Sequence, residues 1–412
     1  MTWNGCGPEA GEAMAGGQLV ESRSQELVPR LSRDGSFSLY SPEFGEGFHC
    51  ADGALSEARR VFVAPAELQR FAAGGTLRVL EVAVGTGTNT AALVQACQER
   101  GLRLDWWGLE LDPLPLRLAL GDDGFRRQWP GAVLGHLESL CGGERLLWGD
   151  GRVRLPQLLE RLAGRCDLVL HDGFSPRHCP QLWSLEFLRD LAGLLAPRGR
   201  LLTYCSAAAV RRSLLLCELQ LAAISSPDPA RASAPLTSSA TGLTTPASTD
   251  AKTDGRSEAT EAWRAGSRQG VWSAGTVASP SALVPGPVLR RLSPMELEHL
   301  ACRAGEPYRD PGRNGTAAAI LERRLQQQRL SAAESSGQWQ RRWGLARRHG
   351  PPPQHGSPPQ LGPPPQLGSL PPQLGPLPPQ AESDRTSAVR QAVGPGPVDA
   401  GSERPGPAER AR

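Results

Sequence analysis

The stretch TLRVLEVAVGTGTNTAALVQACQER, residues 76–100, decides the fold of this chain. Its first part, 76–84, is short, apolar and rich in branched side chains, which predicts a buried strand. Its last part, 88–100, has the residue spacing of a helix. The turn between them carries Gly85 and Gly87. Glycines at such a turn let the backbone come close to a bound cofactor, although a tight turn without a ligand would use them as well.

Outward from this unit, strands and helices continue to alternate. Apolar runs predict strands at 104–111, 145–150, 166–172 and 198–205, and helical spacing predicts helices at 113–121, 131–141, 155–164, 180–196 and 207–224. Apolar strands between helices form a parallel sheet that is covered on both faces. We therefore expect a Rossmann-like α/β core over residues 31–224, with a mostly parallel twisted sheet. Ligands of such sheets bind beyond the carboxyl ends of the strands.

The composition changes outside this core. We expect residues 1–30 to form a disordered arm, and 225–265, rich in Ser, Thr, Ala and Pro, to be a low-complexity insertion. Residues 266–330 are expected to return as closing strands and helices. A PPPQLG-type repeat dominates beyond Gly350, which predicts a disordered Pro-rich tail over 331–412. Such a tail is a possible ligand for a peptide-binding partner, although plain low complexity is the simpler interpretation.

Charge and cysteine usage narrow the function classes. The formal net charge of +3 provides no strong field that would steer the protein to nucleic acid or membrane. The nine cysteines form no CxxC pair, and no HxH or HxxxH spacing occurs, so we expect no metal and a reducing compartment. The N-terminus lacks the features of a secretory signal, and no apolar run reaches the length of a membrane span. We expect a cytoplasmic protein; its oligomeric state is not indicated.

Carboxylates flank the predicted strands. Glu81 precedes the glycines, and Glu110 and Asp150 close the second and third strands. After the second strand a carboxylate can accept both ribose hydroxyls of a nucleoside, and after the third it can accept from the adenine amino group. A solvated acid and a helix cap are the respective alternatives. The GxGxxG pattern of dinucleotide sites would place a third glycine at Thr90, which disfavours NAD and FAD. S-adenosylmethionine, which lacks a pyrophosphate, suits this pattern better.

A further carboxylate, Asp172, follows the fourth strand and opens the turn Asp-Gly-Phe-Ser-Pro. It lies where a transferred methyl group should emerge. A carboxylate there can position an amine and take its proton, because only a deprotonated amine has the lone pair that attack requires. A capping Asp in a tight turn is the alternative. Arg211, in the last predicted helix, is one of several arginines that can contact the phosphates of a nucleic acid.

These motifs together resemble one family, the methyltransferase part of the bifunctional tRNA 5-methylaminomethyl-2-thiouridine biosynthesis enzyme MnmC and its stand-alone relatives. The similar stretches are Tyr40-Ser41, Gly53 to Arg59 with Val61-Phe62, Glu81 to Asn89, Gly149-Asp150 with Leu155 to Leu158, Asp172 to Trp183, and Thr203-Tyr204 with Val210-Arg211-Arg212 after it. Their order and spacing agree over roughly residues 40–215. The turn that begins at Asp172, followed by a proline and a tryptophan, is the most specific of them.

The resemblance implies a class I S-adenosylmethionine-dependent methyltransferase. Its implied substrate is tRNA, in which 5-aminomethyl-(2-thio)uridine at the wobble position becomes the 5-methylaminomethyl form. The residues discussed above and those implied by the resemblance make up the expected site. Expected to bind the cofactor are Glu81, Gly85, Gly87, Asn89, Glu110 and Asp150. Asp172 and Tyr204 are expected to act in catalysis, and the substrate is expected to contact Phe174, Pro176, Trp183 and Arg211.

The sequence also departs from the family pattern. Ala83 stands where the family has glycine, and His178-Cys179 replaces a Lys-Asn pair, which affects substrate contacts. No flavin-binding unit follows the core. These departures leave open methyl transfer to another amine or RNA, and a degenerate fold that serves as a binding platform. The set of four acids counts against the platform. Aminopropyl transfer would want a second acid at Ser175.

Overall fold

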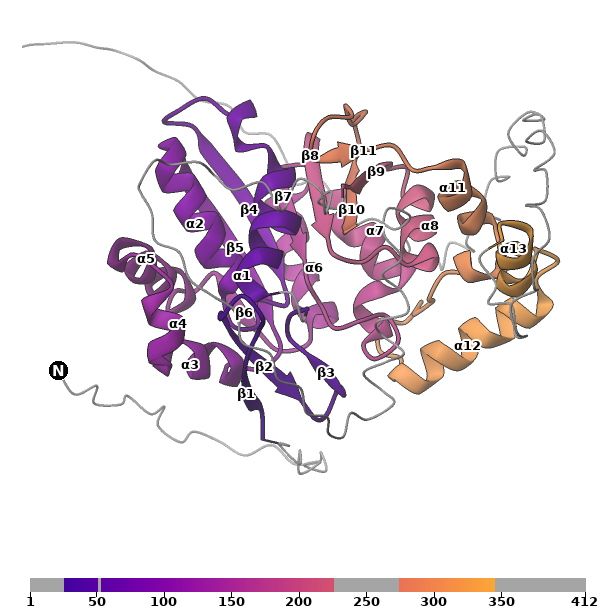
Figure 1. Ribbon diagram of the computed structural model, residues 1–412, viewed down its shortest axis with the longest axis horizontal. Helices are drawn as coiled ribbons and strands as arrows, with labels where there is room; N and C mark the ends of the chain where they lie inside the picture. The colour runs from indigo at the N-terminus through magenta and orange to yellow at the C-terminus, as the bar shows by residue number, and fades with distance from the viewer. Residues whose placement is uncertain (1–25, 51–52, 226–273, 345–412) are drawn as a thin grey trace, which may run out of the picture. The chain divides into compact units, whose positions relative to one another are not determined.

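The computed structural model describes residues 26–50, 53–225 and 274–344 (Figure 1). A large sheet of eight strands lies at its centre, in the order β11-β9-β10-β8-β7-β4-β5-β6. The strands are β4 (Thr76–Val82), β5 (Arg103–Glu110), β6 (Leu146–Trp148), β7 (Cys166–His171), β8 (Leu195–Thr203), β9 (Gln220–Ile224), β10 (Gly275–Ser279) and β11 (Leu289–Arg290). β4 to β8 run parallel, and β9 to β11 add an antiparallel edge. This is the Rossmann-like sheet that the alternation of strands and helices predicts.

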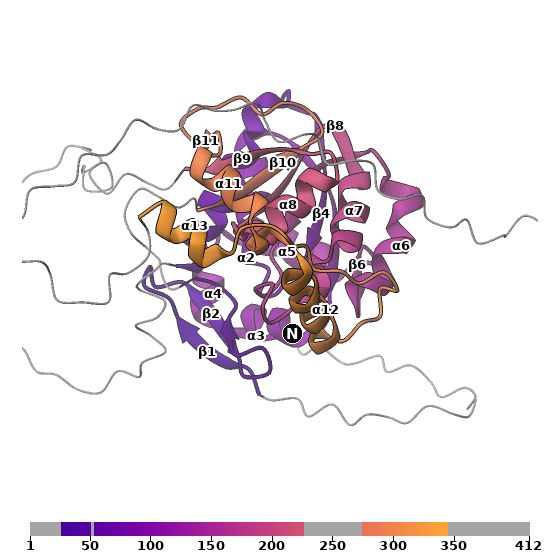
Figure 2. The same ribbon diagram turned by 90° about the vertical axis from the view of Figure 1, so that its right-hand side faces the viewer.

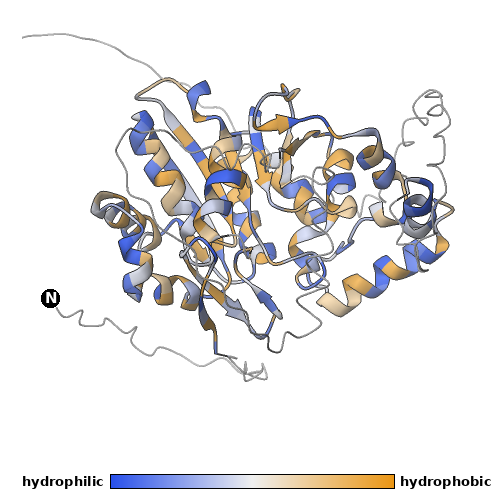
Figure 3. Ribbon diagram, in the orientation of Figure 1, coloured by the Kyte–Doolittle hydropathy of each residue, from blue (hydrophilic) through white to orange (hydrophobic). Residues whose placement is uncertain are grey.

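Helices cover both faces of this sheet, as Figure 1 shows. The first face carries α2 (Thr88–Arg100), α3 (Leu114–Gly121), α4 (Asp123–Arg127), α5 (Gly131–Cys141) and the helical segment made of α1 (Ala54–Glu57) and η1 (Ala58–Val63). The second face carries α6 (Gly151–Leu162), α7 (Leu185–Leu194) and α8 (Ala208–Leu216). Side chains alternate across a strand, so Val79 packs into the first layer and Leu80 into the second. Burial on both faces explains the continuous apolar strands, which are largely orange in Figure 3.

A small antiparallel sheet precedes the core and consists of β1 (Val28–Leu31), β2 (Phe37–Ser41) and β3 (Glu46–Gly47). Its aromatic middle strand buries Phe37 and Leu39 in the first layer. β1 is exposed and pairs with β2 from Val28 to Leu31, so the expectation of a disordered arm up to residue 30 is wrong for its last residues. Backbone pairing, which leaves no apolar signature in the sequence, holds this strand.

The predicted helix 207–224 is wrong at its C-terminal end. α8 stops at Leu216, and Glu218 adopts a left-handed conformation with φ of 63°. The following residues form β9, which lies between β10 and β11. Small apolar residues such as those of β9 are compatible with either structure, and pairing with a strand from far along the chain decides between them.

The C-terminal part of the described chain extends the second layer. β10 pairs with both β8 and β9, and α11 (Pro294–Ala301), α12 (Ala317–Leu330) and α13 (Ser336–Arg342) lie outside α7 and α8 (Figure 2). α13 corrects the expectation of a disordered tail from residue 331, because Trp339 is buried and stacks on His299 with 4.1 Å between ring centroids. Most of the predicted insertion and the rest of the predicted tail lie outside the described residues. Within the described ranges no helix is long and apolar enough to cross a membrane.

Candidate active site

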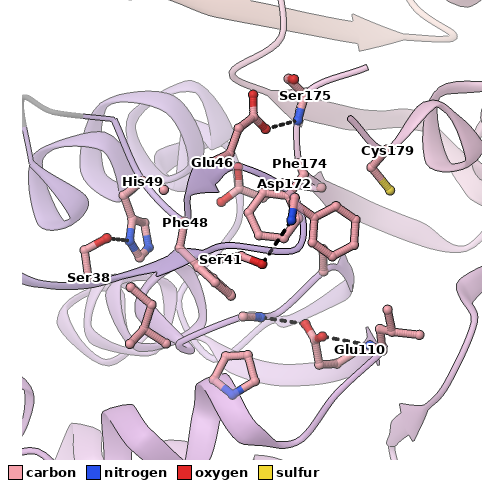
Figure 4. Close-up of a pocket in the computed structure, with 18 of the residues that line it drawn as sticks. Ser38, Ser41, Glu46, Phe48, His49, Glu110, Asp172, Phe174, Ser175 and Cys179 are labelled. Atoms are coloured by element: carbon pink, nitrogen blue, oxygen red, sulfur yellow. Dashed lines mark hydrogen bonds between the residues drawn. The ribbon is translucent and has the colours of Figure 1, made fainter. Parts of the chain in front are cut away.

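A cavity of about 770 Å³ opens at the carboxyl ends of the parallel strands. This is where a sheet of this topology binds its ligands. Its walls come from the residues that end β4 to β8 and from the small N-terminal sheet, which lies against this edge of the large sheet. Of the residues predicted for the site, those that line the cavity are Gly85, Glu110, Asp150, Asp172, Phe174 and Tyr204. Figure 4 labels Glu110, Asp172 and Phe174 among them.

The glycine turn forms one wall. Gly85 and Gly87 have φ of 58° and 78°, a region that favours glycine. Gly85 lines the cavity, and a Cβ on it would lie 3.2 Å from the Phe48 ring. Gly87 is not among the lining residues, and a Cβ there would meet Leu116 at 3.0 Å instead. Gly85 therefore shapes the wall of the cavity, whereas the lack of a side chain at Gly87 is explained by helix packing and by its backbone conformation.

Glu110 ends β5 and is held by the backbone. Its Oε2 accepts the Gly85 N–H at 2.7 Å, and its Oε1 accepts those of Leu111 and Asp112 at 2.7 and 3.1 Å. Burial raises the pKa of Glu110, and these backbone hydrogen bonds oppose the rise. The carboxylate is fixed against the glycine turn and retains acceptor capacity for hydroxyl groups of a ligand.

Glu81 and Asn89, which were expected to bind the cofactor, lie behind the glycine turn and are not among the residues that line the cavity. Glu81 is fully buried, and its Oε2 accepts from Thr90 Oγ1 at 2.6 Å and Trp106 Nε1 at 2.9 Å. Burial raises the pKa of Glu81 to about 7. Asn89 Nδ2 donates to Asp172 at 2.7 Å. Glu81 Oε1 and Asn89 Oδ1 are buried and have no hydrogen-bond partner within the described chain.

Asp150 both lines the cavity and caps α6, so the two alternatives for this residue hold together. Its Oδ1 accepts the Arg152 N–H at 2.9 Å, and the Arg152 guanidinium grips the carboxylate, with Nη2 2.6 Å from Oδ2. Partial burial acts to raise the pKa of Asp150, but the hydrogen bonds and charge of Arg152 outweigh it, and the pKa lies below the usual value. Asp150 is therefore a permanent anion.

Asp172 follows β7, where the sheet places it beside the cavity. Its side chain accepts from Asn89. Burial and the negative charge of Glu57 raise the pKa of Asp172 well above its usual range, and the Asn89 hydrogen bond opposes them. Glu57, on α1, lines the same cavity. A carboxylate in this setting has a high proton affinity, which is the property a general base needs.

Phe174 and Tyr204 form the wall next to Asp172. Phe174 stacks on Phe44, in the turn between β2 and β3, with 4.4 Å between ring centroids. It also meets Phe48 edge to face at 5.1 Å. Tyr204 donates its hydroxyl proton to the Gly173 carbonyl at 2.9 Å. Burial raises the pKa of Tyr204 well above its usual value, so the phenol stays protonated and keeps this donor role. Tyr204 therefore fixes the turn that carries Asp172.

Three residues expected to contact the substrate do not reach the cavity. Trp183 is fully buried, stacks on His171 and donates its Nε1 proton to the Phe174 carbonyl at 2.7 Å. Pro176 is buried beneath the same turn and is not among the lining residues. Arg211 is 2% exposed and bonded to Glu296 and Thr276. These three side chains pack or bond within the protein behind the cavity wall, and they support the fold there.

The small sheet contributes residues that the sequence did not assign to the site. Glu46 accepts the Ser175 N–H at 2.8 Å (Figure 4). It also lies 3.0 Å from His178, so it ties the small sheet to the turn that begins at Asp172. His49 bonds to Ser38 at 2.9 Å, and burial lowers the pKa of His49 to about 4. The aromatic character of GFHC, residues 47–50, was the feature of the sequence that could have assigned this segment to the site. Among the described residues no group of His, Cys, Asp and Glu could hold a metal.

Comparisons with known proteins agree with this geometry. Residues 125–228 match a family model described as S-adenosyl-L-methionine-dependent methyltransferase. The tRNA 5-methylaminomethyl-2-thiouridine biosynthesis bifunctional protein MnmC of Pseudomonas aeruginosa UCBPP-PA14 is 36% identical over 204 residues, which are 45% of this chain and 31% of that protein. The MnmC of Cupriavidus necator is 33% identical over 208 residues, 45% of this chain and 30% of that protein. The chain thus spans about a third of the length of these relatives.

A solved structure is similar as well. The crystal structure titled MNMC2 from Aquifex aeolicus superposes with a TM-score of 0.53 at 23% identity, and the match covers 75% of this chain and 86% of that one. The likeness supports the methyltransferase fold over more of the chain than the sequence matches cover.

Proposed function

We propose that this chain, which carries an S-adenosylmethionine-dependent methyltransferase domain of the MnmC type, methylates the aminomethyl nitrogen of 5-aminomethyl-(2-thio)uridine at the wobble position of tRNA. The observation that carries the proposal is the place of Asp172, a carboxylate of high proton affinity in the cavity wall at the end of β7. The MnmC relatives are named for the biosynthesis of 5-methylaminomethyl-2-thiouridine in tRNA, and the modified uridine and the tRNA of the proposal come from them. A cytoplasmic location, which the sequence predicts, would give access to tRNA.

The residues present fit S-adenosylmethionine. The cavity volume of about 770 Å³ lies in the range of small-molecule sites. Glu110 would hold the ribose hydroxyls, and Asp150 would face the adenine amino group. Glu81 Oε1 and Asn89 Oδ1 are buried behind the glycine turn without donors among the described residues, which suits a buried water at that turn. When bound, the cofactor supplies a methyl group that its sulfonium makes transferable.

The chain's own contribution to the reaction centres on one proton. An alkylamine is an ammonium ion at neutral pH and has no lone pair. Asp172 attracts that cation and takes its proton, which leaves a neutral amine in the cavity. Asn89 holds the carboxylate from behind, and Tyr204 holds its turn at Gly173. Phe174, packed on Phe44 and Phe48, provides an apolar wall that excludes water from the amine.

The test is a transfer assay with labelled S-adenosylmethionine and the full chain. The acceptor is tRNA that carries 5-aminomethyl-2-thiouridine, with unmodified tRNA and free polyamines as controls. We expect label in the modified tRNA alone, at the wobble nucleoside. Binding of S-adenosylmethionine without transfer to this tRNA would contradict the proposed acceptor, and absence of binding would contradict the proposed cofactor.

One observation favours a second acceptor, another amine or RNA. The family's Lys-Asn pair is His178-Cys179 here, and His178 Nδ1 lies 3.0 Å from Glu46 Oε1. A side chain engaged with Glu46 is poorly placed for a phosphate or a base. The polyamine and unmodified-tRNA controls of the same assay distinguish this candidate from the first.

A further inference from the structure

A segment far along the chain contacts Arg152, a residue in the wall of the cavity. Residues 306–316, here called the anchor segment, connect η5 (Arg303–Gly305) to α12. The anchor segment contacts α7 at three points: the Leu185 N–H donates to the Tyr308 carbonyl at 2.9 Å, the Asp310 N–H donates to Glu186, and Arg313 pairs with Asp190. The anchor segment is therefore bound firmly to the core beside α6.

Asp310 of the anchor segment is buried and bonded on both oxygens. Its side chain is 2% exposed. Oδ1 accepts the Gly315 N–H at 2.9 Å, and Oδ2 accepts from Arg152 Nη1 at 2.8 Å. Arg152 Nη1 also donates to the Gly315 carbonyl at 2.8 Å. An ion pair this deeply buried, with both Asp310 oxygens bonded, fixes the geometry of both partners, because breaking it would strand a charge.

Arg152 uses its other side to hold Asp150. Nε lies 3.1 Å from each oxygen of Asp150, and Nη2 lies 2.6 Å from Oδ2. The Arg152 side chain is 11% exposed, whereas that of Asp150 is 38% exposed, and both residues line the cavity. A carboxylate offers about four acceptor positions. Arg152 supplies three donors, its backbone N–H, Nε and Nη2, and Nε is shared between the two oxygens. Three donors use about three of these positions, which leaves about one for a ligand.

We propose that Asp310 is a positioning residue for the nucleoside end of the cavity, acting through Arg152 to hold the Asp150 carboxylate in the one orientation that receives the exocyclic amino group of adenine. This inference rests on the proposed function, because it assumes the nucleoside cofactor. The guanidinium is a planar fork that can grip two carboxylates at once, whereas a lysine could not. The cofactor site thus extends beyond the parallel core to a segment that follows β10.

The experiment compares two ligands that differ at one group. S-adenosylhomocysteine presents a 6-amino donor, and S-inosylhomocysteine presents a 6-oxo acceptor, which a fixed carboxylate disfavours. Dissociation constants for both are measured by calorimetry on the full chain. We expect the wild-type chain to prefer the adenine ligand. In Asp310→Asn the amide can keep its oxygen on the Gly315 N–H but turns an NH₂ group toward Arg152. We expect adenine affinity to fall about tenfold, and inosine affinity to change little.

Asp190→Asn is the matched control. It loosens the same anchor segment at Arg313 but does not touch Arg152 or Asp150. We expect it to keep the wild-type preference. Arg152→Lys keeps the charge and loses the fork, so it should lose the preference as Asp310→Asn does. The same preference in wild type, Asp310→Asn and Arg152→Lys, or an equal loss in Asp310→Asn and Asp190→Asn, would overturn the inference alone. A wild-type chain that binds neither ligand would overturn the proposed function as well.

Discussion

Asp150 follows β6 and Asp172 follows β7, at the same edge of the sheet with β4 and β5 between them. Both line the same cavity, yet their surroundings are opposite. Arg152 grips Asp150 and keeps the pKa of that carboxyl below its usual value. Burial and the charge of Glu57 raise the pKa of Asp172 well above it. The comparison teaches that the end of a strand gives a carboxylate access to the ligand, while its neighbours decide whether it remains a fixed anion or exchanges a proton.

The substitution Asp172→Asn tests the difference between the two carboxylates most directly. The amide keeps the shape of the side chain but cannot accept a proton, so we expect turnover to fall by about 10²–10⁴-fold, the usual contribution of a general base. Cofactor affinity should stay near that of the wild type. Single-turnover rates and calorimetric titration with S-adenosylhomocysteine measure the two quantities. Equal losses in both would mean that Asp172 has a structural role.

The pH profile sharpens the same contrast. Asp172 must be ionised to take a proton, so below its raised pKa the rate should fall about tenfold per pH unit. Glu57→Gln removes a negative charge that raises this pKa. The pKa of Asp172 then falls, and the acid limb of the profile moves to lower pH. Glu43→Gln, at an exposed carboxylate that also lines the cavity, is the control and should leave the limb in place. An unmoved limb in Glu57→Gln would exclude this pair as its origin.

Asp150→Asn should act on binding rather than on turnover. The variant weakens the pair with Arg152 and the acceptor for the adenine amino group, so we expect the Kd for S-adenosylhomocysteine to rise about tenfold, the scale of a hydrogen bond to a charged group. Turnover at saturating cofactor should change by no more than about threefold, because Asp150 does not take part in the proton transfer. A turnover loss comparable to that of Asp172→Asn would remove the distinction between the two carboxylates.

The smallest expected effect is on stability. The pKa of Asp172 is higher in the folded than in the unfolded chain, so the folded state binds the proton more tightly and loses stability as pH rises above the unfolded value. Asp172→Asn removes this cost. At pH 7.5 we expect its Tm to exceed that of the wild type by roughly 2–4 °C, the response of a domain of this size to about 1 kcal/mol. The difference should shrink toward pH 4, and a constant difference would contradict this explanation.

Much of the fold follows from sequence periodicity, and its errors have identifiable causes. The strands from β4 to β8 are buried on both faces, and their apolar runs are unmistakable. β9 was not predicted because alanines suit helix and strand alike. Pairing with a strand from beyond residue 273 makes this segment a strand. α13 was not predicted because its segment is polar, and the burial of Trp339 depends on α11.

The site divides in the same way. Glu110, Asp150 and Asp172 were predictable as cavity residues because a parallel sheet gathers the ends of its strands at one edge. Glu81, Asn89 and Trp183 lie one layer deeper, a distinction that a motif does not encode. Glu46 and the link from Asp310 to Arg152 depend on contacts between segments over a hundred residues apart in sequence, which spacing along the chain does not record.

The joint between β9 and β10 has a consequence for how this protein can be altered. Ile224 faces Gly275 in antiparallel register, and the Ala274 N–H donates to the Ile224 carbonyl at 3.1 Å. The two ends of the intervening chain are thus clamped side by side, as in a hairpin, whatever lies between them. The entropy of closing a loop grows only with the logarithm of its length, about 0.6 kcal/mol per doubling. This position is therefore suited to the insertion of a foreign domain. In the sheet it lies on the opposite side of β8 from β4 and its glycine turn.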